Sequence, residues 1–272
     1  MVTQTSKHTP INKSDLVHRY GPWAMVTGAS DGIGMEIARL LAQKGFDLLL
    51  VARSKDRLNA LSVEFSTQFH VSCKTIVANL ANDEGLAAVQ SALESHEVGL
   101  FVAAAGFGTS GKFINNSLPI EREMLQVNCA AVLDGVHHAA LQMRQRKKGA
   151  IVLFSSLVAF HGTAFSAHYA ATKAWVQSLG EGLRLELKTD GIDVLVSAPG
   201  PVSTGFARRA DMQMGKALTA HEVALSTVNA IGKKGFIRPG WLSKLLGWSL
   251  GMLPRSMRVV LMSKIMSGMT KN

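Results

Sequence analysis

The sequence predicts an α/β fold: a single doubly wound Rossmann-type domain with a seven-stranded parallel sheet and a C-terminal helical extension. Short apolar runs alternate with helical patterns along most of the 272 residues. Runs without polar alternation are typical of strands buried on both faces of a parallel sheet. The first run leads into a glycine-rich turn at the start of a helix. This order implies right-handed crossovers and helices on both faces of the sheet.

Composition limits the class of protein. Hydrophobic residues make up 47% of the chain and charged residues 18%, as in a globular protein with a large core. Cys73 and Cys129 show neither a disulfide framework nor a metal-ligand spacing, and no apolar run near the start predicts a signal peptide. We therefore expect a cytoplasmic protein without a bound metal, with membrane association left open for residues 241–272.

The net charge of +10 lies largely near the C-terminus. No acidic residue follows Glu222, whereas eight Lys and Arg residues do. Three explanations remain: attraction to an anionic membrane surface, attraction to an acidic substrate such as an acyl thioester of a phosphorylated carrier, and solubility of an apolar tail. Nucleic acid is not an expected partner, because neither a recognition motif nor a basic stripe with interleaved aromatic residues accompanies the charge.

Seven apolar runs are the expected strands. We divide the chain into a polar N-terminal segment (1–20), an NADP-binding catalytic domain (21–240) and a hydrophobic, basic helical extension (241–272). Gly45 and the run Lys147-Lys148-Gly149 are expected to end helices. The expected strands are 23–28, 47–52, 74–80, 100–105, 150–155, 193–198 and a weaker 235–238. Ligands of such sheets bind beyond the carboxyl ends of the strands, so the residues just after each run matter most.

The turn after the first run predicts a pyrophosphate site. Its spacing is G-x-x-x-G-x-G, which differs from the usual G-x-G-x-x-G. Unpaired N–H groups at the helix start and the helix dipole favour an anion there, although an ordinary strand-to-helix turn is the alternative. The candidate cofactor-binding residues of the turn are Gly28, Ser30, Asp31, Gly32, Ile33 and Gly34.

The ends of the next three runs indicate which dinucleotide binds. An acid after the second strand is typical of NAD sites, whereas an arginine accommodates the 2′-phosphate of NADP. Arg53 stands there without an acid, which favours NADP. Asn79 follows the third run, and Ala105 belongs to a small-residue stretch after the fourth, where a flat ring fits against the backbone.

The fifth run ends at a serine, and a tyrosine and a lysine follow on one helix face. Ser156 closes the run, while Tyr169 and Lys173 have the i, i+4 spacing that stacks side chains. A free tyrosine has a pKa of about 10, so a neighbouring cation would help it to transfer protons. Lys173 offers that charge, and Ser156 offers a hydrogen bond to a carbonyl oxygen.

These residues together resemble the short-chain dehydrogenase/reductase family over about residues 20–205. The resemblance implies hydride transfer between a nicotinamide and a carbonyl or alcohol carbon, with Tyr169 as general acid or base and Ser156 orienting the carbonyl. It also implies that Lys173 contacts the ribose and lowers the pKa of Tyr169. Asn128 would hold a water that links Lys173 to solvent, and Asn128, Tyr169 and Lys173 would all contact the cofactor.

The resemblance extends to the segment 199–204. Pro199 and Gly200 would lie beside the nicotinamide, and Val202 and Thr204 would contact its carboxamide. The family also implies a homodimer or homotetramer that assembles through the helices containing Asn128 and Tyr169.

Residues 20–24 and 50–54 resemble one branch of the family, that of the hydroxysteroid dehydrogenases and 3-oxoacyl-thioester reductases. This branch implies NADP and an apolar substrate. Two positions depart from the common pattern. Asn79 stands where the family commonly has Asp, and the sequence Ala-Ala-Ala-Gly at 103–106 replaces Asn-Asn-Ala-Gly.

The extension crowds apolar residues into 241–253, and Pro254 can start a second helix at 255–269. The first piece is too short to span a bilayer, which needs about 20 apolar residues. It can cap a substrate pocket, contact another subunit or lie in a membrane interface. Arg255 and Lys264 project to opposite faces of the second piece, which favours a lid or a subunit contact over a membrane contact.

The sequence therefore predicts an NADP(H)-dependent oxidoreductase that interconverts a hydrophobic ketone, steroid-like or 3-oxoacyl, and its secondary alcohol. Two alternatives remain open. One is a catalytically idle dinucleotide-binding sensor or scaffold, and the other is a membrane-surface interaction protein that uses the basic tail.

Overall fold

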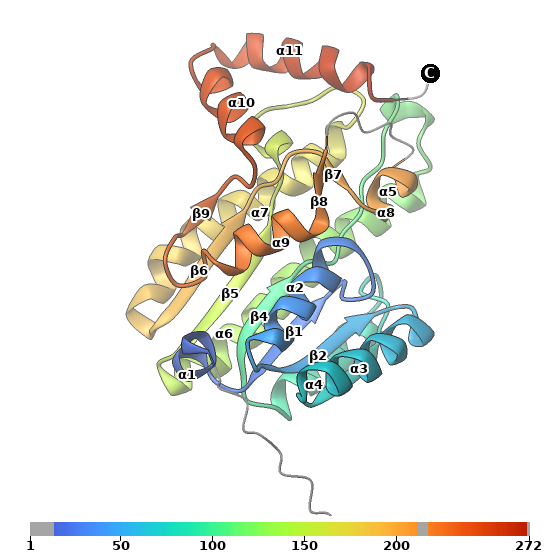
Figure 1. The fold of residues 1–272 in the computed structure, drawn as a ribbon. Helices are drawn as coiled ribbons and strands as arrows, with labels where there is room; N and C mark the ends of the chain where they lie inside the picture. The colour runs from blue at the N-terminus through green and yellow to red at the C-terminus, as the bar shows by residue number, and fades with distance from the viewer. Residues whose placement is uncertain (1–13, 211–216, 271–272) are drawn as a thin grey trace, which may run out of the picture.

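Seven parallel strands form the middle layer of the computed structural model, which describes residues 14–210 and 217–270 (Figure 1). The strand order is β3-β2-β1-β4-β5-β6-β9. The expected doubly wound sheet and its seven strands are confirmed. Their bounds are β1 Trp23–Thr27, β2 Asp47–Ala52, β3 Cys73–Val77, β4 Val98–Ala103, β5 Gly149–Phe154, β6 Ile192–Ser197 and β9 Phe236–Ile237.

Helices cover both faces of the sheet because its central strands are apolar on both sides; every residue of β4 and β5 is buried. One face packs against α1 (Asp15–Tyr20), α2 (Gly32–Gln43), α3 (Lys55–Phe69) and α9 (Ala220–Val228). The other packs against α4 (Asp83–Glu94), α6 (Ala131–Arg146) and α7 (Ala167–Glu186). The strand order reverses between β1 and β4, which opens a crevice at their carboxyl ends.

The long helix expected after Pro119 is interrupted. Helix α5 (Leu118–Leu125) passes into a π turn, η2 (Gln126–Ala130), before α6 begins. Helix α6 ends with Lys147 in the left-handed conformation, and Gly149 is the first residue of β5, so the prediction that Gly149 ends the helix is wrong. A Cβ at Gly149 would lie 2.4 Å from Met143, which explains the glycine. Gly45 follows α2 with a φ of 86°, as expected.

Residues 15–20 of the predicted N-terminal segment form α1, and the rest of that segment falls on residues 1–13, outside the described ones. Tyr20 is buried, and its hydroxyl donates to Asp193 on β6 at 2.7 Å. Arg19 pairs with the same carboxylate, so α1 is fixed to the sheet.

Short elements surround the sheet's carboxyl end, and two helices form the C-terminal extension (Figure 1). No described helix is long and apolar enough to cross a membrane. The short elements are η1 (Phe113–Asn115), η3 (Leu157–Phe160), η4 (Leu187–Asp190), β7 (Val202–Ser203), α8 (Gly205–Arg209) and β8 (Leu218–Thr219). The extension consists of α10 (Trp241–Gly251) and α11 (Arg255–Ser267), as the Pro254 boundary predicts.

Candidate active site

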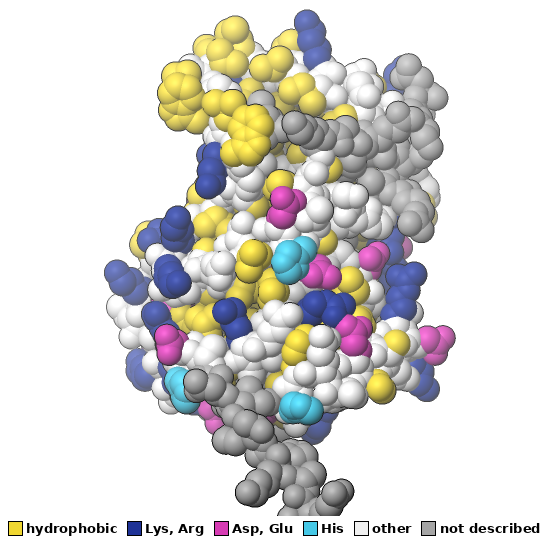
Figure 2. Space-filling view, viewed as in Figure 1, with side chains coloured by type: hydrophobic (Ala, Val, Ile, Leu, Met, Phe, Trp, Pro, Cys, Tyr) yellow, Lys and Arg dark blue, Asp and Glu magenta, His cyan; other side chains and the backbone are white. Residues whose placement is uncertain are grey.

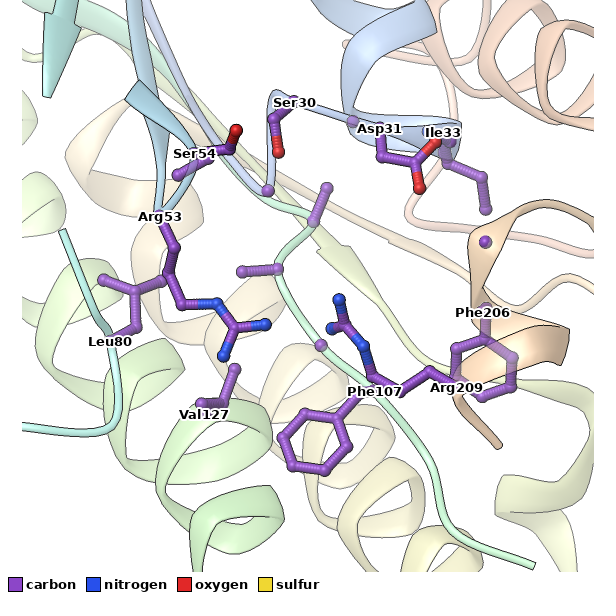
Figure 3. A pocket seen from close by; sticks show the side chains of 18 of the residues that line it. Ser30, Asp31, Ile33, Arg53, Ser54, Leu80, Phe107, Val127, Phe206 and Arg209 are labelled. Atoms are coloured by element: carbon purple, nitrogen blue, oxygen red, sulfur yellow. Dashed lines mark hydrogen bonds between the residues drawn. The ribbon is translucent and has the colours of Figure 1, made fainter. Parts of the chain in front are cut away.

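A cavity of about 290 Å³ lies beyond the carboxyl ends of β1, β2 and β4 (Figure 3). Its lining brings together the residues predicted from the first four strand ends, and Thr204 joins them from the segment after β6. The predicted residues in the lining are Gly28, Ser30, Asp31, Gly32, Ile33, Gly34, Arg53, Asn79 and Ala105.

The glycine turn is shaped by close backbone contacts. Gly28 has a φ of 70°, and a Cβ there would lie 2.8 Å from the Cα of Ala105. A Cβ at Gly34 would lie 2.4 Å from the carbonyl oxygen of Gly28, so glycine lets α2 pack on the turn. Asp31 caps α2 by accepting from the N–H of Gly32 at 2.8 Å. The turn thus presents the start of α2 to the cavity, where the helix dipole favours phosphate.

Three arginines line this cavity: Arg53, Arg57 and Arg209. The guanidinium groups of Arg53 and Arg209 both point into the cavity (Figure 3). Arg53 Nη1 lies 3.3 Å from an oxygen of Glu123, and both side chains are exposed. No sequence pattern indicated Arg209, whereas the position of Arg57 in the first turn after β2 was a signal for a second cation. A phosphate beyond the pyrophosphate fits this set.

A second cavity of about 190 Å³ adjoins the first and shares Ile33, Ala104 and Gly106 with it. Its lining joins the remaining predicted residues to a wall of apolar side chains from the C-terminal extension. The predicted residues are Ser156, Tyr169, Lys173, Pro199, Gly200, Val202 and Thr204. The wall consists of Met262, Ile265, Met266 and Met269. The expected position of the extension as a lid is therefore present, although no pattern singled out these methionines.

Ser156 and Tyr169 reach this cavity from different elements. Strand β5 ends two residues before Ser156, and Tyr169 lies in the first turn of α7. Burial raises the pKa of the Tyr169 phenol to about 12, and a hydrogen bond with Ser156 opposes that rise. The phenol is therefore protonated at neutral pH.

Lys173 is almost completely buried, with 7% of its surface exposed. Its ammonium donates to the carbonyl oxygen of Phe154 at 2.9 Å and lies 5.8 Å from the centre of the Tyr169 ring. Burial lowers the pKa of Lys173 to about 8. The expectation that Lys173 lowers the pKa of Tyr169 is outweighed by the burial of the phenol.

Asn128 is fully buried in the π turn and is not among the residues that line either cavity. Its amide donates to Phe107 O at 2.9 Å and Thr172 Oγ1 at 3.1 Å, and Oδ1 accepts from Phe107 N at 3.1 Å. A Cβ at Gly106 would lie 3.0 Å from Asn128 Oδ1 and 3.5 Å from Lys173 Nζ. Glycine keeps this space open. Because π turns often mark functional sites, the placement supports a role near Lys173.

A buried carboxylate beside the start of α7 was not predicted. Glu121 is 3% exposed, and its Oε1 accepts from Thr109 Oγ1 at 2.7 Å and Asn116 Nδ2 at 2.8 Å. Its other oxygen lies 2.5 Å from Nδ1 of His168, the residue before Tyr169. Glu121 thus connects α5 and the loop after β4 to the helix that carries the tyrosine. The 47-residue separation of Glu121 and His168 leaves no local sequence signal.

Comparison with known proteins identifies similar chains. The family model described as short chain dehydrogenase matches residues 22–215. A very-long-chain 3-oxoacyl-CoA reductase-like protein of Arabidopsis thaliana is 32% identical over 244 residues, covering 87% of this chain and 78% of the relative. An inactive hydroxysteroid dehydrogenase-like protein 1 of Homo sapiens is 31% identical over 198 residues, covering 72% and 60%.

A solved structure, described as a short-chain dehydrogenase from Sphingobium yanoikuyae in complex with NADPH, superposes with a TM-score of 0.79. It is 30% identical, and the match covers 89% of this chain and 95% of that one. The sequence and structure comparisons therefore agree on the same kind of protein.

Substitution of Glu121 tests the buried carboxylate. Glu121→Ala leaves the donors of Thr109, Asn116 and His168 without their acceptor, so we expect the free energy of unfolding to fall by about 3–5 kcal/mol. Urea unfolding followed by circular dichroism measures this loss. The matched control is Glu123→Ala on the same helix, whose exposed ion pair contributes about 1 kcal/mol or less. Equal losses in the two variants would contradict the structural role of Glu121.

Proposed function

The chain belongs to the short-chain dehydrogenase family, and we propose that it is an NADP(H)-dependent oxidoreductase. In this proposal the protein interconverts a hydrophobic ketone, steroid-like or 3-oxoacyl, and its secondary alcohol. The observation that carries the proposal is the meeting of Ser156, Tyr169 and Lys173 at an apolar cavity that adjoins the presumptive nucleotide cavity of the glycine turn. A proton donor and an apolar substrate surface thus lie next to a dinucleotide-sized space.

The proposed cofactor is NADP, and the first cavity fits its parts. The N–H groups at the start of α2 would hold the pyrophosphate, and Arg53 and Arg57 would hold the 2′-phosphate. Asn79 and Ala105 would contact the adenine side, while residues 199–204 would lie along the nicotinamide. When bound, the nicotinamide supplies or accepts the hydride. The NADPH complex of the similar solved structure supports this choice of cofactor.

The proposed proton donor for ketone reduction is Tyr169. With a pKa of about 12 the phenol keeps its proton at neutral pH and can give it to the ketone oxygen. Ser156 donates a hydrogen bond to the same oxygen, and the Lys173 ammonium stabilises the phenolate that forms. A water between Asn128 and Lys173 would return a proton to the site. A protonated phenol at rest favours reduction over oxidation at neutral pH.

An apolar, adaptable wall supports a bulky hydrophobic substrate. Met262, Met266 and Met269 line the cavity, and flexible thioether chains fit ligands of different shape. The name of the Arabidopsis relative supports a 3-oxoacyl thioester as one candidate. The basic extension would attract the phosphates of such a substrate's carrier.

We also propose a homodimer or homotetramer through α6 and α7. Leu133, Leu141 and Trp175 lie on these helices with between 36% and 47% of their surface exposed. Exposed apolar side chains on neighbouring helices are typical of a subunit contact.

The alternative of an idle dinucleotide sensor is favoured by one observation, the relative whose name calls it inactive. The presence of Ser156, Tyr169 and Lys173 around one cavity speaks for an enzyme, because a sensor does not need a proton donor. Measuring NADPH oxidation with a panel of hydrophobic ketones distinguishes the two. NADPH binding without oxidation of any ketone would favour the sensor.

The two tyrosines of the chain make a matched pair for testing the proton donor. Tyr169→Phe removes the phenolic proton, so we expect kcat for ketone reduction to fall by about 10²- to 10⁴-fold. Tyr20→Phe removes a hydroxyl bonded to Asp193 on the opposite side of the fold and should leave kcat unchanged. Steady-state NADPH oxidation measures both variants. Retained activity in Tyr169→Phe would reject the proposed mechanism.

Arg53 tests the preference for NADP. Arg53→Ala removes a charged hydrogen-bond donor for the 2′-phosphate, so the KM for NADPH should rise by about 10- to 100-fold. The KM for NADH, which lacks that phosphate, should change little. Lys55→Ala is the control, because Lys55 is exposed nearby but is not part of the cavity lining. An equal rise in KM for both cofactors would contradict a 2′-phosphate contact.

The pKa of Lys173 predicts a pH dependence of reduction. Lys173 is an ammonium below its pKa of about 8 and loses its charge above it. We therefore expect kcat to be constant below about pH 8 and to fall roughly tenfold per pH unit above it. Lys173→Arg keeps the charge at high pH, so its lower activity should not show this fall. The same high-pH fall in both proteins would assign it to another group.

A further inference from the structure

Helix α10 carries an exposed apolar stripe. Trp241, Leu245, Trp248 and Met252 follow the i, i+4, i+7, i+11 spacing that places side chains on one helix face. The two tryptophans and Met252 are each about two-thirds exposed, at 67%, 65% and 66%. Such large apolar side chains gathered on one surface mark an interaction site. Lys244 lies on the same face, three residues after Trp241.

Helix α11 is apolar on two opposite faces. Met262 and Met266 are buried and line the substrate cavity. On the other side Met257, Val260 and Leu261 are between 42% and 57% exposed, and Lys264 continues their stripe at the i+7 position from Met257. Hydrophobic side chains gather over α10 and α11 at the top of Figure 2. The outward stripes of the two helices are named the C-terminal apolar surface here.

The charge of this region indicates an anionic occupant. No acidic side chain occurs after Glu222, while Lys244, Arg255 and Lys264 belong to the two helices and are exposed. A second copy of the chain related by a two-fold axis would set the same surface against itself. The lysines would then face each other without a carboxylate to pair with. Self-association through this surface is therefore disfavoured.

We propose that the C-terminal apolar surface docks on the surface of a membrane containing anionic lipid. Tryptophan side chains suit the interface between headgroups and acyl chains, and a lysine within an apolar stripe can extend its ammonium to lipid phosphates while its stem lies on apolar surface. Both helices are too short to span a bilayer, so they lie in the plane of the interface. These features together favour lipid over an acidic protein partner.

The position of Ile265 connects this surface to the substrate cavity. Ile265 lines the cavity and is also 40% exposed, so the cavity wall and the outward surface meet at this residue. A docked α11 would hold the cavity next to the acyl-chain boundary, from which a hydrophobic ketone can enter. This last step rests on the proposed function, whereas the docking itself does not.

Vesicle sedimentation of the full chain tests the docking. The vesicles contain phosphatidylcholine alone or with phosphatidylserine. We expect the protein to sediment with the anionic vesicles, and Trp241→Ser with Trp248→Ser to weaken partition at least tenfold. Lys244→Gln with Lys264→Gln should weaken it about fivefold per lysine, and for the anionic vesicles alone. NADPH oxidation and thermal unfolding are measured on the same samples, so failure of catalysis is seen separately from failure of docking.

The control variant is Val63→Ser with Leu185→Ser, which removes two apolar side chains exposed at 66% and 70% on other helices. It should sediment as the unchanged protein does. Failure of the unchanged protein to bind anionic vesicles would overturn the proposal, as would equal binding by the tryptophan variant. A concentration-dependent dimer that the tryptophan substitutions abolish, without vesicle binding, would assign the surface to a second copy instead.

Discussion

The site depends on the burial of one cation. An ammonium group withdrawn from water is costly unless polar partners replace its hydration. Lys173 donates to the carbonyl oxygen of Phe154, the last residue of β5, so the end of a central strand fixes the position of the charge. The remaining desolvation lowers its pKa to about 8. A lysine near its pKa at physiological pH can both hold and release a proton, which an exposed lysine cannot.

The surroundings of Lys173 are arranged at the level of the backbone. Gly106 leaves space between the ammonium and Asn128 Oδ1, and the π turn places Asn128 where its amide can bond to both Phe107 and Thr172. A regular helix would rotate position 128 relative to α6 by shortening this turn. Because three hydrogen bonds hold the amide, the irregular turn is stabilised by the contacts that it makes possible. Glu121 holds the neighbouring loop and α7 by a similar set of buried bonds.

The features that sequence predicts here are those set by local pattern. Seven strands follow from uninterrupted apolar runs, and the cavity lining from Gly28 to Gly34 follows from a glycine spacing within one turn. The π turn, the Glu121–His168 contact and Arg209 in the cavity depend on segments that meet after folding. Gly149 shows the same limit, because its glycine answers the packing of Met143 and not the end of a helix. Local rules cannot indicate such contacts.

Helix α11 shows why its own pattern was difficult to interpret. Arg255 and Lys264 on opposite faces suggested a helix without a segregated apolar side, yet the helix packs with one side and exposes the other. Met262 and Met266 occupy the side toward the cavity, so they contribute nothing to the outward stripe around Lys264. A helix that is apolar on two sides has a weak overall asymmetry, because the two sides cancel. Its inner side then answers to the shape of the substrate and its outer side to the medium outside, and each can change without the other.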